Sequence, residues 1–192
     1  LDMDTLEREE DNYSVTLTAR DVEAFGTAAT LAQFRFFNFS LEEGGYCGLD
    51  QVHIVFPESA DKEAVLAALT EAFGPEAQEY TQYDYITGSP RTYAKEEGIS
   101  RWFSPTKLGN VLSEEERPAF RDLYLMGLSD EDLASLMESE PVSIATWTED
   151  YYGQIEAEHG STPALEAAVE EYGRVATLDL NGEHMARVLQ MS

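Results

Sequence analysis

The fold is decided by residues 34–56, FRFFNFSLEEGGYCGLDQVHIVF. In the first part, residues 34–41, aromatic side chains fall on both faces, which is typical of a buried central strand. The glycines of residues 42–48 supply a turn, and residues 49–56 are again apolar and β-branched. The whole stretch therefore predicts an antiparallel hairpin.

Two segments precede this hairpin. Residues 13–19 (YSVTLTA) alternate and carry β-branched side chains, which predicts a strand. Residues 21–34 are rich in alanine and place apolar side chains at helical spacing, so we expect a helix there despite Gly26.

Four helices and four strands are expected after the hairpin. Each helix combines an N-terminal cap with an apolar stripe. The predicted caps are, in chain order, Ser59 or Asp61, Ser113, Ser129, and Ser161 or Thr162. The predicted strands are residues 79–87, 98–104, 142–147 and 174–180, with turn residues at 88–90 and a looser segment from 148 to 160.

This order of elements predicts an α+β fold, with a mostly antiparallel sheet and helices packed on one face. A chain of 192 residues suits one hydrophobic core, so we expect a single domain over residues 12–192. Residues 1–11 are polar and acidic and are expected to form a flexible lead.

The charge of the chain restricts its partners. There are 38 acidic side chains against 12 Lys and Arg, a formal net charge of −26. Such a surface repels the phosphates of nucleic acids and anionic lipids, so we expect no nucleic-acid partner. Three meanings remain for the charge: a solubility surface, a docking face for a basic partner, or diffuse binding of divalent cations.

Catalytic and metal-binding motifs are absent from the sequence. No zinc, Walker, dinucleotide-binding or GxSxG motif occurs, and no apolar run is long enough to span a membrane, so neither a cofactor, a metal nor a transmembrane segment is expected. Cys47, the only cysteine, precedes a predicted strand, and neither His53 nor His159 nor His184 stands in a recognisable relation to it. We read Cys47 as a semi-buried thiol and predict no catalytic residue.

Aromatic side chains supply the candidate binding residues. They are Tyr80, Tyr83, Tyr85, Tyr93, Trp102, Trp147 and Tyr151. Interleaved with small polar residues, such a set suits the stacking of sugars or a protein-binding face. The alternative is that alternate members pack one face of the sheet as ordinary core.

These observations favour a non-catalytic binding or interaction domain with a protein or glycan partner. The chain begins at Leu1, which favours an exported bacterial-type protein, secreted or lipid-anchored, that has lost its targeting peptide. A cytoplasmic acidic inhibitor or immunity-like protein that blocks a basic partner is the first alternative. A hydrolase without a recognisable motif is the second.

Overall fold

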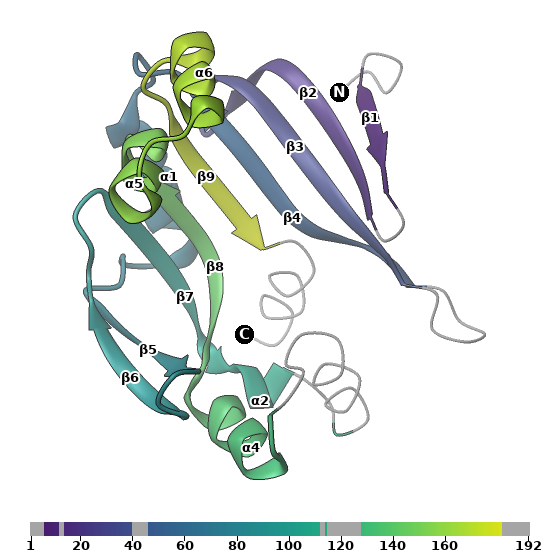
Figure 1. Ribbon diagram of the computed structural model, residues 1–192, viewed down its shortest axis with the longest axis vertical. Coiled ribbons are helices and arrows are strands. Elements are labelled where there is room, and N and C mark those ends of the chain that lie inside the picture. Colours follow the sequence, from purple (N-terminus) through teal and green to yellow (C-terminus); the bar gives the residue numbers. More distant parts are fainter. Residues whose placement is uncertain (1–5, 12–13, 40–45, 112–113, 115–127, 182–192) are drawn as a thin grey trace.

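The computed structural model describes residues 6–11, 14–39, 46–111, 114 and 128–181. In these residues, seven strands form one antiparallel sheet in the order β1-β2-β3-β4-β9-β8-β7 (Figure 1). They are β1 (Glu7–Glu10), β2 (Ser14–Ala24), β3 (Thr27–Phe39), β4 (Tyr46–Phe56), β7 (Ile99–Lys107), β8 (Pro141–Thr148) and β9 (Ala176–Asn181). Strands β5 (Glu79–Asp84) and β6 (Ser89–Ala94) form a separate hairpin.

The described helices lie at the two ends of this sheet, apart from the first along the chain, which packs onto its core face (Figure 1). They are α1 (Lys62–Phe73), α2 (Leu108–Val111), α4 (Asp130–Ser139), α5 (Tyr151–His159) and α6 (Pro163–Tyr172). Helices α5 and α6 contact each other at one end, and α4 packs against α2 and the β5–β6 hairpin at the other (Figure 1). The predicted α+β class with a mostly antiparallel sheet is confirmed.

Helix α1 begins and ends as its sequence predicts. The side chain of Asp61 accepts a hydrogen bond from the Ala64 backbone nitrogen at 3.1 Å, which satisfies one of the free N–H groups of the first turn. Val65 and Leu69 are fully buried, and Gly74 follows the last turn with a φ of 86°.

Helices α4 and α6 also follow their predicted caps. Ser129 and Asp132 form a reciprocal capping box at the start of α4. Thr162 caps α6, and Pro163 takes its first position. The helix predicted after Ser113 falls on residues outside the described part of the chain.

The predicted hairpin of residues 34–56 is confirmed as the pair β3–β4. The two strands are antiparallel, with Phe34 opposite Val52 and Phe36 opposite Leu49. The register shifts between Arg35 and Phe36, as in a β-bulge. Strand β3 lies between β2 and β4, so it is an interior strand of the sheet.

The predicted helix over residues 21–34 is wrong. Phe25 and Gly26 have φ values of 52° and 76° and connect β2 to β3 in a two-residue turn. Two positive φ values are the geometry that suits the twist of a hairpin. Ala29 and Ala32 are buried in the sheet, so tertiary burial outweighs the helical preference of alanine.

Three further segments differ from prediction, wholly or in part. The segment after residue 148, expected to be loose, contains α5, which has no buried residue and therefore no apolar stripe to reveal it. The turn expected at residues 88–90 lies at residues 85–88, so Gly88 is a turn residue as predicted, while Ser89 and Pro90 already belong to strand β6, where Pro90 pairs with Tyr83. The predicted lead is also structured in part, since Glu7–Glu10 pairs with β2 as an edge strand.

The hydrophobic core lies on one face of the sheet. Its cross-strand row contains Ala32, Ile54, Leu178 and Trp147, which face one another in register. Val65 and Leu69 of α1 pack onto this face, and both are fully buried. Burial of these apolar surfaces is the main source of stability for the fold.

Candidate functional site

The opposite face of the sheet is polar. The strand register aligns one polar residue from each of five neighbouring strands, namely Thr18, Gln33, His53, Asp179 and Thr146. An adjacent row contains Thr16, Arg35, Gln51 and Asn181. Alternate side chains of a strand point to opposite faces, so the residues between these rows belong to the core face. The alternation that builds the core therefore also builds a polar platform.

A histidine–aspartate pair lies within this polar face. His53 Nδ1 is 2.7 Å from Asp179 Oδ1, and the two side chains are 24% and 31% exposed. The side-chain amide of Gln51 donates to the same oxygen at 2.7 Å. Since an ionised carboxylate only accepts hydrogen bonds, His53 carries its proton on Nδ1. In the neutral imidazole, Nε2 is then a hydrogen-bond acceptor.

A solvent-open hollow of about 470 Å³ lies over this pair. The sheet contributes Glu9, Thr16, Gln33, Arg35, Gln51, His53 and Asp179, and Tyr151 of α5 completes the lining. Small-molecule sites usually measure about 300 to 1,000 Å³. The hollow has the size of a ligand site, with a lining more polar than most.

Tyr151 is the aromatic member of this lining. Its ring centroid lies 6.1 Å from that of His53, with the ring planes at 60°. The Tyr151 backbone nitrogen donates to the Val175 carbonyl oxygen at 2.9 Å, which fixes the start of α5 beside the start of β9. Burial, and then the negative charge of Asp179, raise the pKa of the Tyr151 phenol. The phenol is therefore protonated at neutral pH and can donate a hydrogen bond.

Carboxylates predominate among the charged groups of the hollow. Glu9 and Asp179 contribute two, and Arg35 contributes a guanidinium. Nη2 of Arg35 lies 2.6 Å from Oδ2 of Asp50, so that charge is already neutralised by a neighbour. Among the described residues, the hydrogen bonds to Asp179 reach only its Oδ1. Oδ2 of Asp179 accepts no hydrogen bond from the part of the chain that the structure describes.

Three of the predicted aromatic binding residues, Trp102, Trp147 and Tyr83, are core residues. Trp102 and Trp147 are each 1% exposed, so their placement on a binding surface is wrong. Trp102 donates its indole N–H to the Gly74 carbonyl oxygen at 3.2 Å, and Trp147 packs against Phe56 with ring centroids 5.3 Å apart. They lie on the core face of β7 and β8, so these two residues follow the alternative prediction, that aromatic residues of the strands pack into the core.

Tyr80 and Tyr93 form a stacked pair across the β5–β6 hairpin. Their ring centroids are 5.6 Å apart at an interplanar angle of 20°. The guanidinium of Arg101 lies 5.4 Å from the Tyr80 centroid, and that of Arg91 lies 5.5 Å from the Tyr93 centroid. These contacts stabilise the hairpin by cation–π attraction. A binding role for the pair stays a prediction.

Tyr83 and Tyr85 are close in space and differ in exposure. Tyr83 is 3% exposed, packs with Leu136 and Met137 of α4, and donates its hydroxyl to Asp132 at 3.2 Å. Tyr85 is 60% exposed and meets the Tyr83 ring edge-on at 5.3 Å. The predicted aromatic residues therefore occupy separate places, and only Tyr151 lies in the polar hollow.

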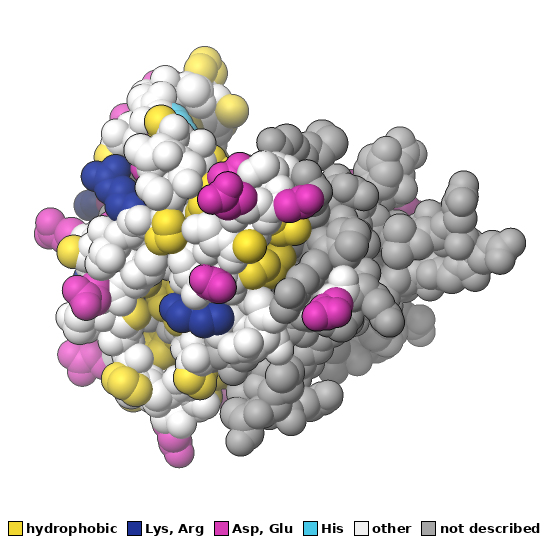
Figure 2. Space-filling model, turned by 90° about the horizontal axis from the view of Figure 1, so that it is seen from below, with side chains coloured by type: hydrophobic (Ala, Val, Ile, Leu, Met, Phe, Trp, Pro, Cys, Tyr) yellow, Lys and Arg dark blue, Asp and Glu magenta, His cyan; other side chains and the backbone are white. Residues whose placement is uncertain are grey.

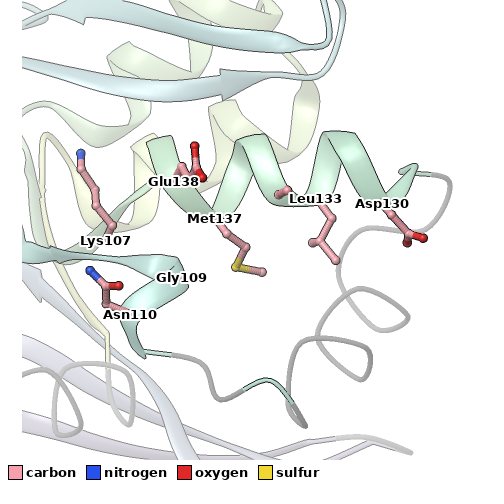
Figure 3. Close-up of a pocket in the computed structure, with 8 residues that line it drawn as sticks. Lys107, Gly109, Asn110, Asp130, Leu133, Met137 and Glu138 are labelled. Carbon is pink, nitrogen blue, oxygen red and sulfur yellow. The ribbon is translucent and has the colours of Figure 1, made fainter.

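A second hollow, of about 520 Å³, lies between α2 and α4 (Figure 3). Lys107, Leu133 and Met137 are among its lining residues. Gly109 allows the close approach of the two helices, because a Cβ there would lie 2.9 Å from the Met137 carbonyl oxygen. This hollow flanks, in sequence, residues outside the described part of the chain, and no convergent titratable pair lies among its described lining residues.

Reasoning from the sequence missed the polar pair. The alternation of Gln51 and His53 with apolar residues in the strand 49–56 was the available signal, and Asp179 alternates in the same way in the last strand. Their meeting depends on the pairing of β4 with β9, which brings together residues 126 positions apart. The side chain of Cys47 lies outside the described residues, as does His184, and His159 is exposed beside Glu158.

The described residues contain no group of three or more His, Cys, Asp or Glu side chains that could hold a metal ion. No helix in the described part is both long and apolar enough to cross a membrane. Comparison with family models, with curated proteins and with solved structures finds no match to this chain.

Proposed function

We propose that this protein is a non-catalytic binding domain that takes a small polar ligand on the polar face of its sheet. The observation that carries the proposal is the hollow over the His53–Asp179 pair, where backbone pairing holds polar side chains from β2, β3, β4 and β9 in two rows. Sites built on strands hold their side chains more firmly than sites on loops.

Hydrogen bonds within the floor support this assignment. Gln33 donates to Thr18 Oγ1 at 3.3 Å, and Gln51 and His53 both contact Asp179. Side chains oriented in this way lose little conformational entropy when a ligand binds. These hydrogen bonds preorganise the donors and acceptors of the lining, whereas the polar side chains of an ordinary solvent-exposed surface are free to rotate.

The chemistry of the lining favours binding over hydrolysis. A hydrolase that works through a nucleophile needs a serine, cysteine or other activated group within reach of the base. The described lining contains an oriented histidine and the hydroxyl of Thr16, and no serine or cysteine. An oriented histidine acceptor serves recognition of a ligand equally well.

A ligand screen with a blocked hollow tests the proposal. Saturation-transfer NMR with mixtures of small amines, polyols, carboxylates and sugars should give at least one ligand that binds the wild-type protein. The variant Thr16→Trp places a large ring in the hollow and should abolish that signal. Glu23→Trp, at an exposed position of β2 outside the hollow, is the matched control and should leave the signal unchanged.

The outcome against the proposal is equally clear. If no compound binds, or if Thr16→Trp and Glu23→Trp leave binding equally intact, the polar face is not a ligand site. Retained far-ultraviolet circular dichroism of both variants shows that each is folded.

Export of the protein, secreted or lipid-anchored, remains part of this proposal. Its support is the acidic and lysine-poor composition, with 38 acidic side chains against 12 Lys and Arg. Fractionation of cells that express the complete native gene tests it, and recovery of the protein in the cytoplasmic fraction alone would contradict it.

A further inference from the structure

We infer that the hollow on the polar face selects a small organic ammonium ion, that is, a protonated amine with N–H donors. This inference rests on the proposed function and names its ligand class. Four observations carry it: the free acceptors of the His53–Asp179 pair, the excess of carboxylates, the aromatic wall at Tyr151, and the charge of the whole molecule.

The hydrogen-bonding capacity left at the His53–Asp179 pair is that of acceptors. Asp179 Oδ1 already receives Gln51 and His53, while Oδ2 receives no hydrogen bond from a described residue. With Nδ1–H of His53 directed at Asp179, the Nε2 atom of the neutral imidazole is an acceptor. A ligand that brings donors satisfies both atoms, whereas a ligand that brings only acceptors leaves them unpaired.

The charges of the hollow point the same way. Glu9 and Asp179 are carboxylates, and the single guanidinium of the lining, Arg35, is paired with Asp50. An anionic ligand would have to compete with Asp50 for Arg35 while facing Asp179. An ammonium ion instead adds a charge-assisted hydrogen bond to the half-buried Asp179 carboxylate.

The ring of Tyr151 favours a cation over a neutral donor. It lies beside His53, with centroids 6.1 Å apart, and shares the lining with Asp179. The face of a tyrosine ring attracts an ammonium group through its quadrupole, and this attraction is absent for a hydroxyl. The net charge of −26 raises the local concentration of any cation before it reaches the hollow.

A matched set of four-carbon probes tests the ligand class. Putrescine, butane-1,4-diol and succinate have similar length and differ in charge, and isothermal titration calorimetry at constant ionic strength compares their binding. We expect saturable binding of putrescine at one site, affinity for the diol weaker by about tenfold or more, and no binding of succinate. A fourth probe, Nα-acetyl-lysinamide, represents the lysine side chain of a protein. If it binds more tightly than putrescine, the ligand is a protein lysine; if putrescine binds more tightly, the ligand is a free amine.

Variants separate a site from the general attraction of an acidic surface. Asp179→Asn should weaken putrescine binding by about tenfold, because it removes the charge that faces the ligand. Glu23→Gln removes the same charge outside the hollow and should change the affinity by less than about twofold. His53→Phe provides a second variant in the hollow if Asp179→Asn does not fold, and it should also weaken binding.

Three results would overturn the ammonium assignment. They are equal binding of the diol, preferential binding of succinate, and equal effects of Asp179→Asn and Glu23→Gln. If the diol or succinate binds and Thr16→Trp abolishes that binding, the proposed function stands and only the ligand class is wrong. If no probe and no library compound binds in a manner sensitive to Thr16→Trp, both fail.

Discussion

Glu140, which follows α4, shows how a single buried carboxylate links stability to pH. Its Oε2 accepts a hydrogen bond from the Tyr83 backbone nitrogen at 2.7 Å. Burial raises the pKa of the Glu140 carboxyl, and the Tyr83 hydrogen bond and Lys107 act in the opposite direction with smaller effect. Ionisation of this group therefore costs the folded state more than the unfolded state.

The raised pKa of Glu140 makes the stability of the protein depend on pH. The folded protein binds the proton of Glu140 more tightly than the unfolded chain does. The contribution of Glu140 to the free energy of unfolding therefore rises as the pH falls through the raised pKa, and it is complete below about 4.3, the ordinary pKa of glutamate. Relative to Glu140→Gln, the wild-type protein should gain free energy of unfolding between pH 8 and pH 4.5. Urea denaturation of both proteins measures the difference. A difference that does not change with pH, or that shrinks toward acid, contradicts the assignment.

Trp102 and Trp147 give a residue-scale test of the core. Both indoles are 1% exposed, so their fluorescence in the folded protein should be blue-shifted and protected from iodide. Quenching experiments on the native and the urea-unfolded protein measure this protection. Strong quenching of the native protein would place at least one indole at the surface, as the sequence first suggested.

At the scale of elements, the structure follows the sequence where a local signal is complete. The helices α1, α4 and α6 each combine a cap, an apolar stripe and a stop, and all three begin at predicted caps. The hairpin β3–β4 has glycines between two apolar runs. Helix α5 could not be predicted, because none of its residues is buried and its start at Asp150 has a positive φ without a side-chain cap.

The turn between β2 and β3 explains the one helix that was predicted and is absent. Residues 21–34 are rich in alanine and have helical preferences, and a single glycine is tolerated in a helix. The structure shows that Phe25 also adopts a positive φ beside Gly26, which makes the pair a hairpin turn. The decisive contacts are between strands, such as Ala32 opposite Ile54, and no local pattern encodes them.

Gly26 therefore provides an element-scale prediction. Its φ is 76°, and no atom lies within 4 Å of an added Cβ, so the cost of a side chain there is conformational. Gly26→Ala should lower the free energy of unfolding by about 1 kcal/mol. Gly26→Asn should cost less, because asparagine tolerates this region better. Denaturant unfolding of both variants measures the effect, and equal stability of wild type and Gly26→Ala would argue for a different turn.

At the scale of the whole molecule, the charge acts on stability as well as on partners. Acidic side chains are scattered over the described part of the face shown in Figure 2, where basic side chains occur in few places. Repulsion within a surface of net charge −26 opposes the compact state. We expect the melting temperature to rise as NaCl increases from about 0.05 M to about 0.5 M, because salt screens this repulsion. A falling melting temperature would mean that the surface ion pairs outweigh it.

The polar face is assembled from strands that are far apart in the chain, so it could not be predicted from the sequence. Its central residues come from strands at both ends of the chain, with His53 and Asp179 126 positions apart. The alternation within each strand was visible, while the order β4-β9-β8 that aligns the rows was not. Predicting the strands therefore did not predict the site.

The proposed ligand site on the polar face is centred on the His53–Asp179 pair. A titration of ¹⁵N-labelled protein with putrescine, followed by two-dimensional NMR, tests it most directly. We expect saturable shifts that concentrate at the amides of Gln51, His53 and Asp179 and at the side-chain nitrogens of His53. Shifts spread over the acidic exposed surfaces of α4 and α6, with none at β4 and β9, would contradict it.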